Sequence, residues 1–201
     1  MRRRALCAGG FGAAVLAGCE RLGLGGPAKP AFNGVDITGA DYGHDFALPD
    51  VDGKPRTLAD FAGKVAVVFF GYTHCPDVCP TTMADLAAIK QAFGADGARL
   101  QAVFVTIDPD RDTAADLKRY VASFDPAFVA LRGTPEQTLA TAKAFRVFYA
   151  KVPVKGGEGY TVDHTAATYV FDARGRLRLF ERYGTPAEAL KADLKRLLDG
   201  A

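Results

Sequence analysis

Short runs of apolar residues, separated by polar and glycine-rich turns, predict an alternation of strands and helices along most of the chain. The run at residues 65–70 is too short for a core helix and is rich in β-branched and aromatic residues, which is typical of a buried strand. Residues 81–93 carry apolar side chains at helical spacing, and Pro80 stands where a first helical turn tolerates proline. A second buried strand is predicted at residues 100–107, with a helix behind it that reaches about Phe124.

The rest of the pattern predicts a hairpin near each end of this core and further helices. Residues 46–49 and 54–58 flank an Asp-Gly turn and predict a small N-terminal hairpin. Thr134, Pro135 and Gln137 are typical of a capped helix start, and that helix should run to about residue 145. The other predicted elements are a short strand at 128–131, an extended segment at 147–154, a turn at 155–159, a second hairpin at 168–172 and 177–182, and a last helix that repeats the capping pattern from Thr185.

This order is expected for an α/β, thioredoxin-like fold with an N-terminal hairpin and a C-terminal hairpin plus helix. The pattern alone leaves other α/β folds open, but Cys75 and Cys79 lie at the first strand–helix junction and narrow the choice. Backbone N–H groups and the helix dipole stabilise an anion there, so at least one of the two thiols should lose its proton easily. A thiolate is both a nucleophile and a metal ligand.

The N-terminal residues have the composition of an export signal followed by a spacer. Three arginines and the apolar residues 5–15 precede Leu-Ala-Gly-Cys19, which matches the lipobox of bacterial lipoproteins. We therefore expect a signal peptide at 1–18, a lipid on Cys19, a flexible tether at 19–40 rich in Gly, Pro, Ala and Lys, and a folded domain at 41–201. The alternative is an ordinary signal peptide. Either way the domain faces the periplasm or the outer side of the cell membrane.

Composition and charge exclude some classes of function. The chain has 201 residues with a net charge of +2, whereas a nucleic-acid-binding protein usually carries a basic stripe. Its four cysteines are too few for a disulfide scaffold. A monomer is the simplest expectation for the oligomeric state. A basic region near the C-terminus is interpreted as a solvated face, with docking to an acidic partner or to lipid as the alternative. That region contains Arg174, Arg176, Arg178, Arg182, Lys191, Lys195 and Arg196.

The spacing of Cys75 and Cys79 allows either a disulfide or two ligands to one ion. Three residues separate them, whereas the redox pair of thioredoxins has two. A structural disulfide is disfavoured because so short a loop constrains little of the unfolded chain. Pro76 and Pro80 stiffen the loop, which favours a preset geometry.

Three histidines are candidates to complete a metal site. His44 has no partner by spacing and is interpreted as a surface residue. His74 adjoins Cys75, but neighbouring side chains of an extended segment point to opposite faces, so we expect it to tune or pack the loop. His164 lies in the loop predicted to enter the strand at 168–172, which faces the cysteine loop in a thioredoxin-like fold. We therefore expect His164 to be a ligand.

Three segments together resemble the signatures of the Sco/SenC family. They are GYTHCPDVCP at 71–80, VTIDPDRDT at 105–113 and VDHT at 162–165, and the similarity covers roughly residues 42–198. Members of that family are membrane-anchored, thioredoxin-like copper proteins that help to assemble the binuclear copper centre of cytochrome c oxidase. The resemblance implies two thiolate ligands, from Cys75 and Cys79, and an imidazole ligand from His164. The family's usual anchor is a transmembrane helix, in place of which we expect the lipid on Cys19.

The donor set is consistent with copper. Two thiolates and an imidazole are soft ligands that suit Cu(I), and Cu(II) could be held if an oxygen joined them. Structural zinc normally takes four protein ligands, and the sequence offers no convincing fourth. Asp163 is a candidate to orient His164, with a turn cap as the alternative. Asp108 is a candidate support for the site, although a turn stabilised by an Arg111–Asp112 pair is the favoured interpretation.

Two functions remain open. The first is a copper metallochaperone that delivers copper to a subunit of cytochrome c oxidase, assisted by a periplasmic copper donor or thiol reductant. The second is a thiol–disulfide oxidoreductase that reduces the cysteines of that subunit through Cys75 and Cys79. Redox exchange needs no histidine, and reductases of this fold commonly carry a cis-proline in the facing loop, where this chain has Asp163-His164-Thr165. Copper delivery is therefore favoured. A peroxidase is disfavoured because Tyr72 stands where a threonine is needed.

Overall fold

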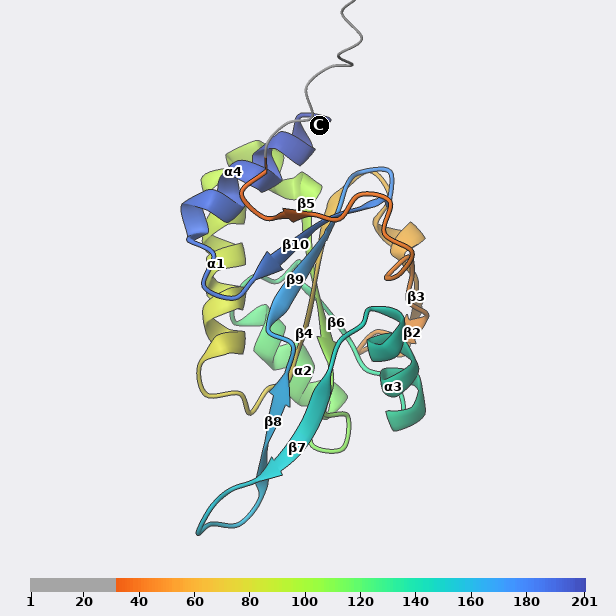
Figure 1. Cartoon of the computed structure of the whole chain (residues 1–201), viewed down its shortest axis with the longest axis vertical. Helices are drawn as coiled ribbons and strands as arrows, with labels where there is room; N and C mark the ends of the chain where they lie inside the picture. The colour runs from red at the N-terminus through yellow and green to blue at the C-terminus, as the bar shows by residue number, and fades with distance from the viewer. Residues whose placement is uncertain (1–31) are drawn as a thin grey trace, which may run out of the picture. The chain divides into compact units, whose positions relative to one another are not determined.

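A six-stranded mixed sheet forms the centre of the folded chain (Figure 1). The computed structural model describes residues 32–201. In order across the sheet, the strands are β1 (Val35–Asp36), β10 (Leu177–Arg182), β9 (Ala167–Phe171), β4 (Val65–Gly71), β5 (Leu100–Thr106) and β6 (Val129–Leu131).

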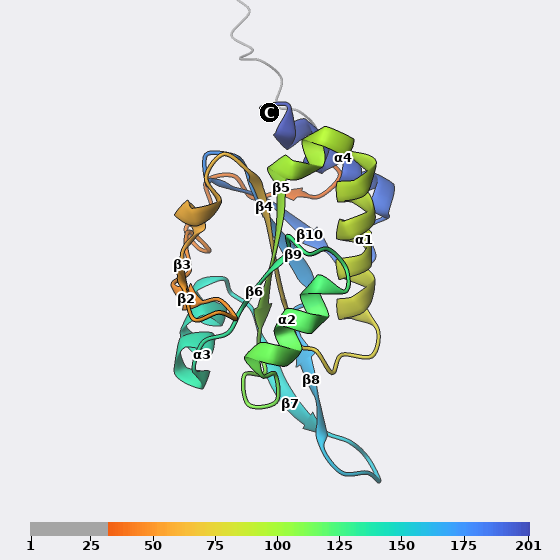
Figure 2. The ribbon, with the colours of Figure 1, turned by 180° about the vertical axis from the view of Figure 1, so that it is seen from behind.

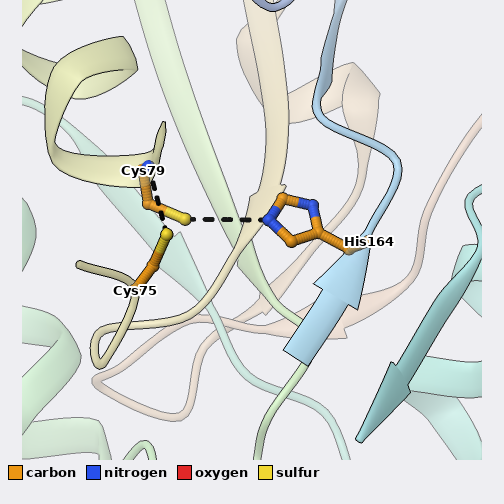
Figure 3. Close-up of side chains that lie close together, drawn as sticks. All are labelled: Cys75, Cys79 and His164. Atoms are coloured by element: carbon orange, nitrogen blue, oxygen red, sulfur yellow. Dashed lines mark hydrogen bonds between the residues drawn. The ribbon is translucent and has the colours of Figure 1, made fainter. Parts of the chain in front are cut away.

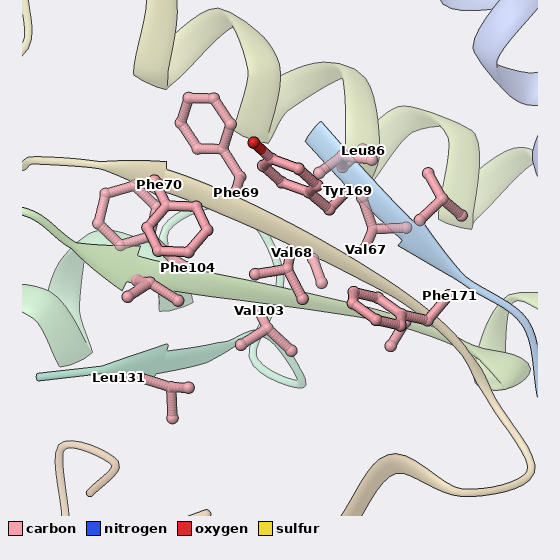
Figure 4. Close-up of a cluster of buried hydrophobic side chains, with 14 of the residues drawn as sticks. Val67, Val68, Phe69, Phe70, Leu86, Val103, Phe104, Leu131, Tyr169 and Phe171 are labelled. Carbon is pink, nitrogen blue, oxygen red and sulfur yellow. The ribbon is translucent and has the colours of Figure 1, made fainter. Parts of the chain in front are cut away.

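The strands β4, β5 and β6 are parallel, whereas β9 pairs antiparallel with β4 and β10 antiparallel with β9. Every residue of β4 and β5 is buried, which explains why β4 is a continuous apolar run and why β5 is apolar except at Gln101 and Thr106. Figure 4 shows side chains of β4 on both faces of the sheet, among them Val67, Val68, Phe69 and Phe70. These two central strands provide a rigid base for the segments that follow them.

Helices cover both sides of the sheet. The views from front and back place α1 and α4 side by side on one side, and α3 with the N-terminal hairpin on the other (Figures 1 and 2). The helix α1 buries Cys79, Met83, Leu86 and Ile89, one helical face, as its spacing predicts. The helices are α1 (Val78–Ala92), α2 (Ala114–Ala122), α3 (Pro135–Ala144) and α4 (Ala187–Leu198), with 3₁₀ turns at Leu58–Phe61 and Gly94–Arg99; the hairpin strands are β2 (Leu48–Pro49) and β3 (Pro55–Arg56).

The thioredoxin-like α/β architecture is thus as predicted, including the hairpin at each end and the closing helix. The capping box of α3 is present: Gln137 N donates to Thr134 Oγ1 at 3.2 Å, and Thr134 N donates to the Gln137 side chain at 2.9 Å. The same pattern before α4 was misleading. Its cap residue is Pro186, without a side-chain cap, because Thr185 belongs to the turn in which its N–H bonds to Arg182 O.

The predicted tether is wrong for its last residues, which belong to the fold. Val35 and Asp36 form β1 and pair with β10. Asn33 N and Gly34 N each donate to the Asp193 carboxylate at 2.8 Å, and Asp193 is fully buried in α4. The folded unit therefore includes residues 32–40, which were predicted as tether. This segment is held because a sheet edge and a buried carboxylate both need hydrogen-bond partners.

The predicted signal peptide, Cys19 and most of the tether lie outside the described residues. Within residues 32–201, no helix combines the length and the apolar character needed to span a membrane.

A second correction concerns the segment that carries His164. It was predicted as a loop, but it forms the strand β8 (Tyr160–His164), which pairs antiparallel with β7 (Tyr149–Pro153). The two strands form a separate sheet that projects beyond the central one (Figure 1). His164 is the last residue of this hairpin and pairs with Tyr149 across it. The turn predicted at 155–159 joins the strands.

Candidate metal centre

Two thiols and an imidazole meet where β4 gives way to α1. One ligand atom each from Cys75, Cys79 and His164 lies within 4.8 Å of the others (Figure 3). Cys79 Sγ is 3.9 Å from His164 Nε2, although 85 residues separate them in sequence. Metal–sulfur and metal–nitrogen bonds of about 2.0–2.3 Å let one ion bridge atoms at such a distance. The structure therefore brings together the three residues that the sequence singled out.

The cysteines are unequally accessible. Cys75 lies in the loop after β4, and its N–H bonds to Tyr72 O at 3.2 Å. Cys79 lies in the first turn of α1, has no exposed surface, and its N–H donates to Cys75 Sγ at 3.4 Å. Both thiols are free. Cys75 is partly exposed and is the sulfur that an incoming group would meet first.

The two thiols also differ in acidity. The hydrogen bond from the Cys79 side chain, helped by the N–H groups of Asp77 and Cys79 and by His164, lowers the pKa of Cys75 from 9.0 to about 5, although burial opposes this. The same hydrogen bond and burial raise the pKa of Cys79. The metal-free pair therefore holds one negative charge at neutral pH, on Cys75, as expected for a thiol beside a helix N-terminus.

This acidity predicts how Cys75 reacts in the reduced, metal-free protein. Only the thiolate is nucleophilic, and the pKa of Cys75 is about 5, so its alkylation rate constant should be half-maximal near pH 5 and flat above about pH 7. Iodoacetamide labelling followed by mass spectrometry measures this profile. In Cys75→Ser, the remaining thiol of the site, Cys79, is buried and should react slowly. A half-maximal point near pH 9 would contradict the assignment.

A glycine makes room for the Cys79 sulfur. A side chain on Gly71 would place its Cβ 2.9 Å from Cys79 Sγ, 2.8 Å from the Phe69 ring and 2.9 Å from the Phe104 ring. Such contacts are too short for carbon, so the close approach of Cys79 to the end of β4 requires glycine at this position. Sequence reasoning did not single out Gly71, although a glycine at the end of a buried strand is a usable signal.

The buried carboxylate of Asp112 anchors the cysteine loop, and sequence reasoning missed it. It accepts hydrogen bonds from Thr73 Oγ1 at 2.6 Å, from Thr73 N at 3.1 Å and from Thr106 Oγ1 at 2.5 Å. Because β4 and β5 are parallel, the segments that follow them leave the sheet at the same edge and can bond in this way. The predicted Arg111–Asp112 pair is wrong: Arg111 Nε donates to Asp108 Oδ2 at 2.5 Å.

A backbone carbonyl orients the imidazole of His164. Nδ1 lies 3.1 Å from Thr165 O, so a proton on Nδ1 satisfies that carbonyl and leaves Nε2 free to face the sulfurs. The rings of Phe69 and Tyr72 each stand edge-on to the imidazole at 6.2 Å. The contact with Thr165, rather than one with Asp163, therefore holds the ring.

Asp163 was a candidate for that orienting role. It is exposed, and it points to the opposite face of β8 from its neighbours in the strand. No hydrogen bond found in residues 32–201 joins its carboxylate to His164.

The other two histidines lie outside the cluster. His44 is exposed, as expected. His74 is also exposed; its Nδ1 lies 3.2 Å from Thr73 Oγ1 and 3.5 Å from Asp112 Oδ1, and it does not belong to the ligand cluster.

Comparison with known proteins agrees with this geometry. The family model described as SCO1/SenC matches residues 35–199. The chain belongs to the SCO1/SenC family. This match covers the cysteine loop, the segment after β5 and the hairpin that carries His164.

Individual relatives in the family differ in length. The mitochondrial SCO2 homolog of Mus musculus is 36% identical over 76% of this chain, but the match spans only 60% of that protein. The copper-bound ScoI of Bradyrhizobium japonicum is 42% identical, with a TM-score of 0.68 over 78% of this chain and 98% of that one. A SCO1/SenC family lipoprotein of Bacillus anthracis is 26% identical, with a TM-score of 0.67 over 83% of this chain and 99% of that one.

Proposed function

We propose that this protein binds copper through Cys75, Cys79 and His164 and delivers it to the binuclear copper centre of a cytochrome c oxidase subunit. The observation that carries the proposal is the convergence of two free thiols and an imidazole nitrogen within 4.8 Å. Membership of the SCO1/SenC family and the copper-bound relative from Bradyrhizobium japonicum support it. Copper is here the cargo, and the chain supplies the ligands.

The donor set favours copper over zinc. Thiolate and imidazole ligands are soft enough for Cu(I), whereas structural zinc sites normally have four protein ligands. Among residues 32–201, the group of potential ligands contains these three side chains and no fourth. A set of three leaves room for a ligand from an acceptor protein.

The position of the site suits transfer. Cys75 and His164 are partly exposed, whereas Cys79 is fully buried beneath them. An acceptor's ligand can therefore approach from the side of Cys75 and His164 without unfolding the domain, while Cys79 stays fixed to α1. Copper would leave by exchange of one ligand at a time.

A thiol–disulfide exchange function is the second candidate, and the unequal thiols favour it specifically. The Cys75 thiolate would attack a partner's disulfide, form a mixed disulfide and release one partner thiolate. Cys79, after losing its proton, would then attack Cys75 Sγ and release the second partner thiolate. The partner gains two electrons, and this chain ends with a Cys75–Cys79 disulfide.

The N-terminal sequence bears on how the domain is attached to the membrane and on which side it lies. We infer that Cys19 carries a lipid, that residues 1–18 are removed, and that the domain works at the outer face of the membrane in the periplasm, as a monomer. The lipobox sequence and the family lipoprotein from Bacillus anthracis support this. The partners are then the copper-receiving oxidase subunit and a periplasmic copper donor or thiol reductant.

The test is an anaerobic copper titration of two forms of the protein. The reduced form is expected to hold one copper per chain against a competing chelator and to pass it to the copper-free oxidase subunit. The form with a Cys75–Cys79 disulfide is expected to hold none, because its sulfurs are no longer thiolates. If the reduced form retains no copper but reduces a disulfide in the subunit, the exchange function replaces the delivery function.

A further inference from the structure

The hairpin that carries His164 is a separate structural unit, so something must set its position against the thiols. Strands β7 and β8 pair with each other and with no strand of the central sheet in the described chain. Four of the five residues of β8 are exposed or only partly buried. The placement of the imidazole therefore depends on the short connection to β9, which begins at Ala167, and on a few contacts between β8 and the body of the domain.

Those contacts occur at every second residue of β8: Tyr160 and His164 make them through their side chains, and Val162 makes one through its backbone N–H. Tyr160 contacts the segment after β5, Val162 N donates to Tyr72 OH at 3.3 Å, and His164 Nε2 faces Cys79 Sγ at 3.9 Å. The residues between them, Thr161 and Asp163, are exposed. Tyr160 and His164 thus lie on the same face of β8, at its two ends.

Arg111 holds the far end of this face. Its Nη1 donates to Tyr160 O at 2.7 Å, and its guanidinium lies 3.7 Å from the centre of the Tyr160 ring. Its Nε donates to Asp108 Oδ2 at 2.5 Å, while Tyr160 OH donates to Asp108 Oδ1 at 2.8 Å. Asp108 is fully buried. The three residues form a closed ring of interactions between the segment after β5 and the hairpin.

The same guanidinium also faces the cysteine side of the site. It lies 5.8 Å from the centre of the Tyr72 ring, and Tyr72 O accepts the N–H of Cys75. Arg111 thus stands between the segment that presents the thiols and the hairpin that presents the imidazole.

The hydrogen bonds of Arg111 do not fully compensate its burial. Its Nη2 is buried and has no hydrogen-bond partner among the described residues. Leaving a charged donor unpaired is costly, and a smaller polar residue would support a turn at lower cost. The planar guanidinium with its several donors is suited to join the two surfaces that it contacts, the hairpin and the segment after β5.

We propose that Arg111, held by Asp108 and stacked on Tyr160, is a positioning residue that keeps His164 against the two thiols. It sets the affinity for copper without taking part in thiol chemistry. This inference rests on the copper binding proposed above.

The test compares Arg111→Gln with Arg119→Gln in the reduced full chain. Arg119 undergoes the same chemical change on α2, where it is exposed and pairs with Asp116. Competition between protein and chelator for Cu(I) should show a 10–100-fold loss of affinity in Arg111→Gln, as for other partners that orient metal ligands, and none in Arg119→Gln. At pH 8, where the Cys75 thiol is fully ionised, its alkylation rate should be unchanged in both.

A double variant separates positioning from general support. In a His164→Ala background, Arg111→Gln should cause no further loss of copper affinity, because the group that it positions is gone. An equal loss in both backgrounds, no loss in either, or a parallel change in Cys75 alkylation would overturn the inference.

Tyr160→Phe keeps the inference testable if Arg111→Gln does not fold. It retains the ring and loses one hydrogen bond to Asp108, so we expect about a fivefold loss of affinity. An unchanged affinity in a folded Tyr160→Phe protein would then overturn the inference. A parent protein that binds no copper would instead overturn the proposed function, and this inference with it.

Discussion

Replacement of Cys79 by serine is expected to abolish tight copper binding and thiol–disulfide exchange together. Cys79 supplies one of the three ligand atoms within 4.8 Å, and a hydroxyl neither ionises near neutral pH nor binds Cu(I) well. The loss of affinity should exceed the 10–100-fold effect typical of residues that only orient ligands. Copper per chain after chelator competition, and reduction of a model disulfide, measure the two losses.

The same substitution should also make Cys75 less acidic. The hydrogen bond with the Cys79 side chain is the largest cause of the lowered pKa of Cys75, about 5 in the parent. Without it, the pKa of Cys75 should rise towards 9.0, so less thiolate is present at pH 7 and alkylation slows.

Cys75→Ser is the matched variant. It should lose copper and exchange equally, while Cys79 stays protonated because its burial still raises the pKa of its thiol. Copper retention by either serine variant at the level of the parent would contradict the ligand assignment.

Replacement of His164 by alanine is expected to weaken copper binding by more than 100-fold and to leave thiol exchange within about threefold of the parent. The imidazole contributes a ligand nitrogen 3.9 Å from Cys79 Sγ, but it lies on a separate hairpin. The acidity of Cys75 depends first on Cys79 and on backbone N–H groups, with His164 as a smaller contribution. Chelator competition and disulfide reduction by the same protein preparation give the two quantities.

His74→Ala is the control for this experiment. His74 adjoins Cys75 in sequence but is exposed and lies outside the ligand cluster, so copper affinity should not change. If His164→Ala binds copper as tightly as the parent, the imidazole is not a ligand and the site is a dithiol. If it loses both activities, the hairpin supports the cysteine loop as well as the metal.

These two results separate the proposed functions. Serine at either cysteine removes a group that both functions need, so it tests the site as a whole. Alanine at position 164 removes a group that only copper binding needs. If the protein is a copper carrier with two thiol ligands, His164→Ala should therefore keep thiol–disulfide exchange and lose tight copper binding.

Local chemistry in the sequence predicted the central strands, the helices and the capped start of α3, because periodicity, β-branched runs and capping residues act within a few positions of one another. The same kind of signal placed Cys75 and Cys79 at the start of α1. It misled at Thr185, where a turn used the residue that resembled a cap.

Other features were decided only by contacts between distant segments. Residues 33–36 read as tether because nothing in their composition shows that β10 and Asp193 offer them partners. Asp112 bonds to Thr73 because the parallel strands β4 and β5 bring the segments that follow them to one edge, and Arg111 bonds to Tyr160 because the β7–β8 hairpin lies against the segment after β5. The imidazole of His164 reaches Cys79 across 85 residues by way of a hairpin that reads locally as a loop. The sequence by itself thus determined which ligand atoms and hydrogen-bonding groups are available. The tertiary structure decided which of them meet, because contacts between remote segments depend on geometry that no local pattern encodes.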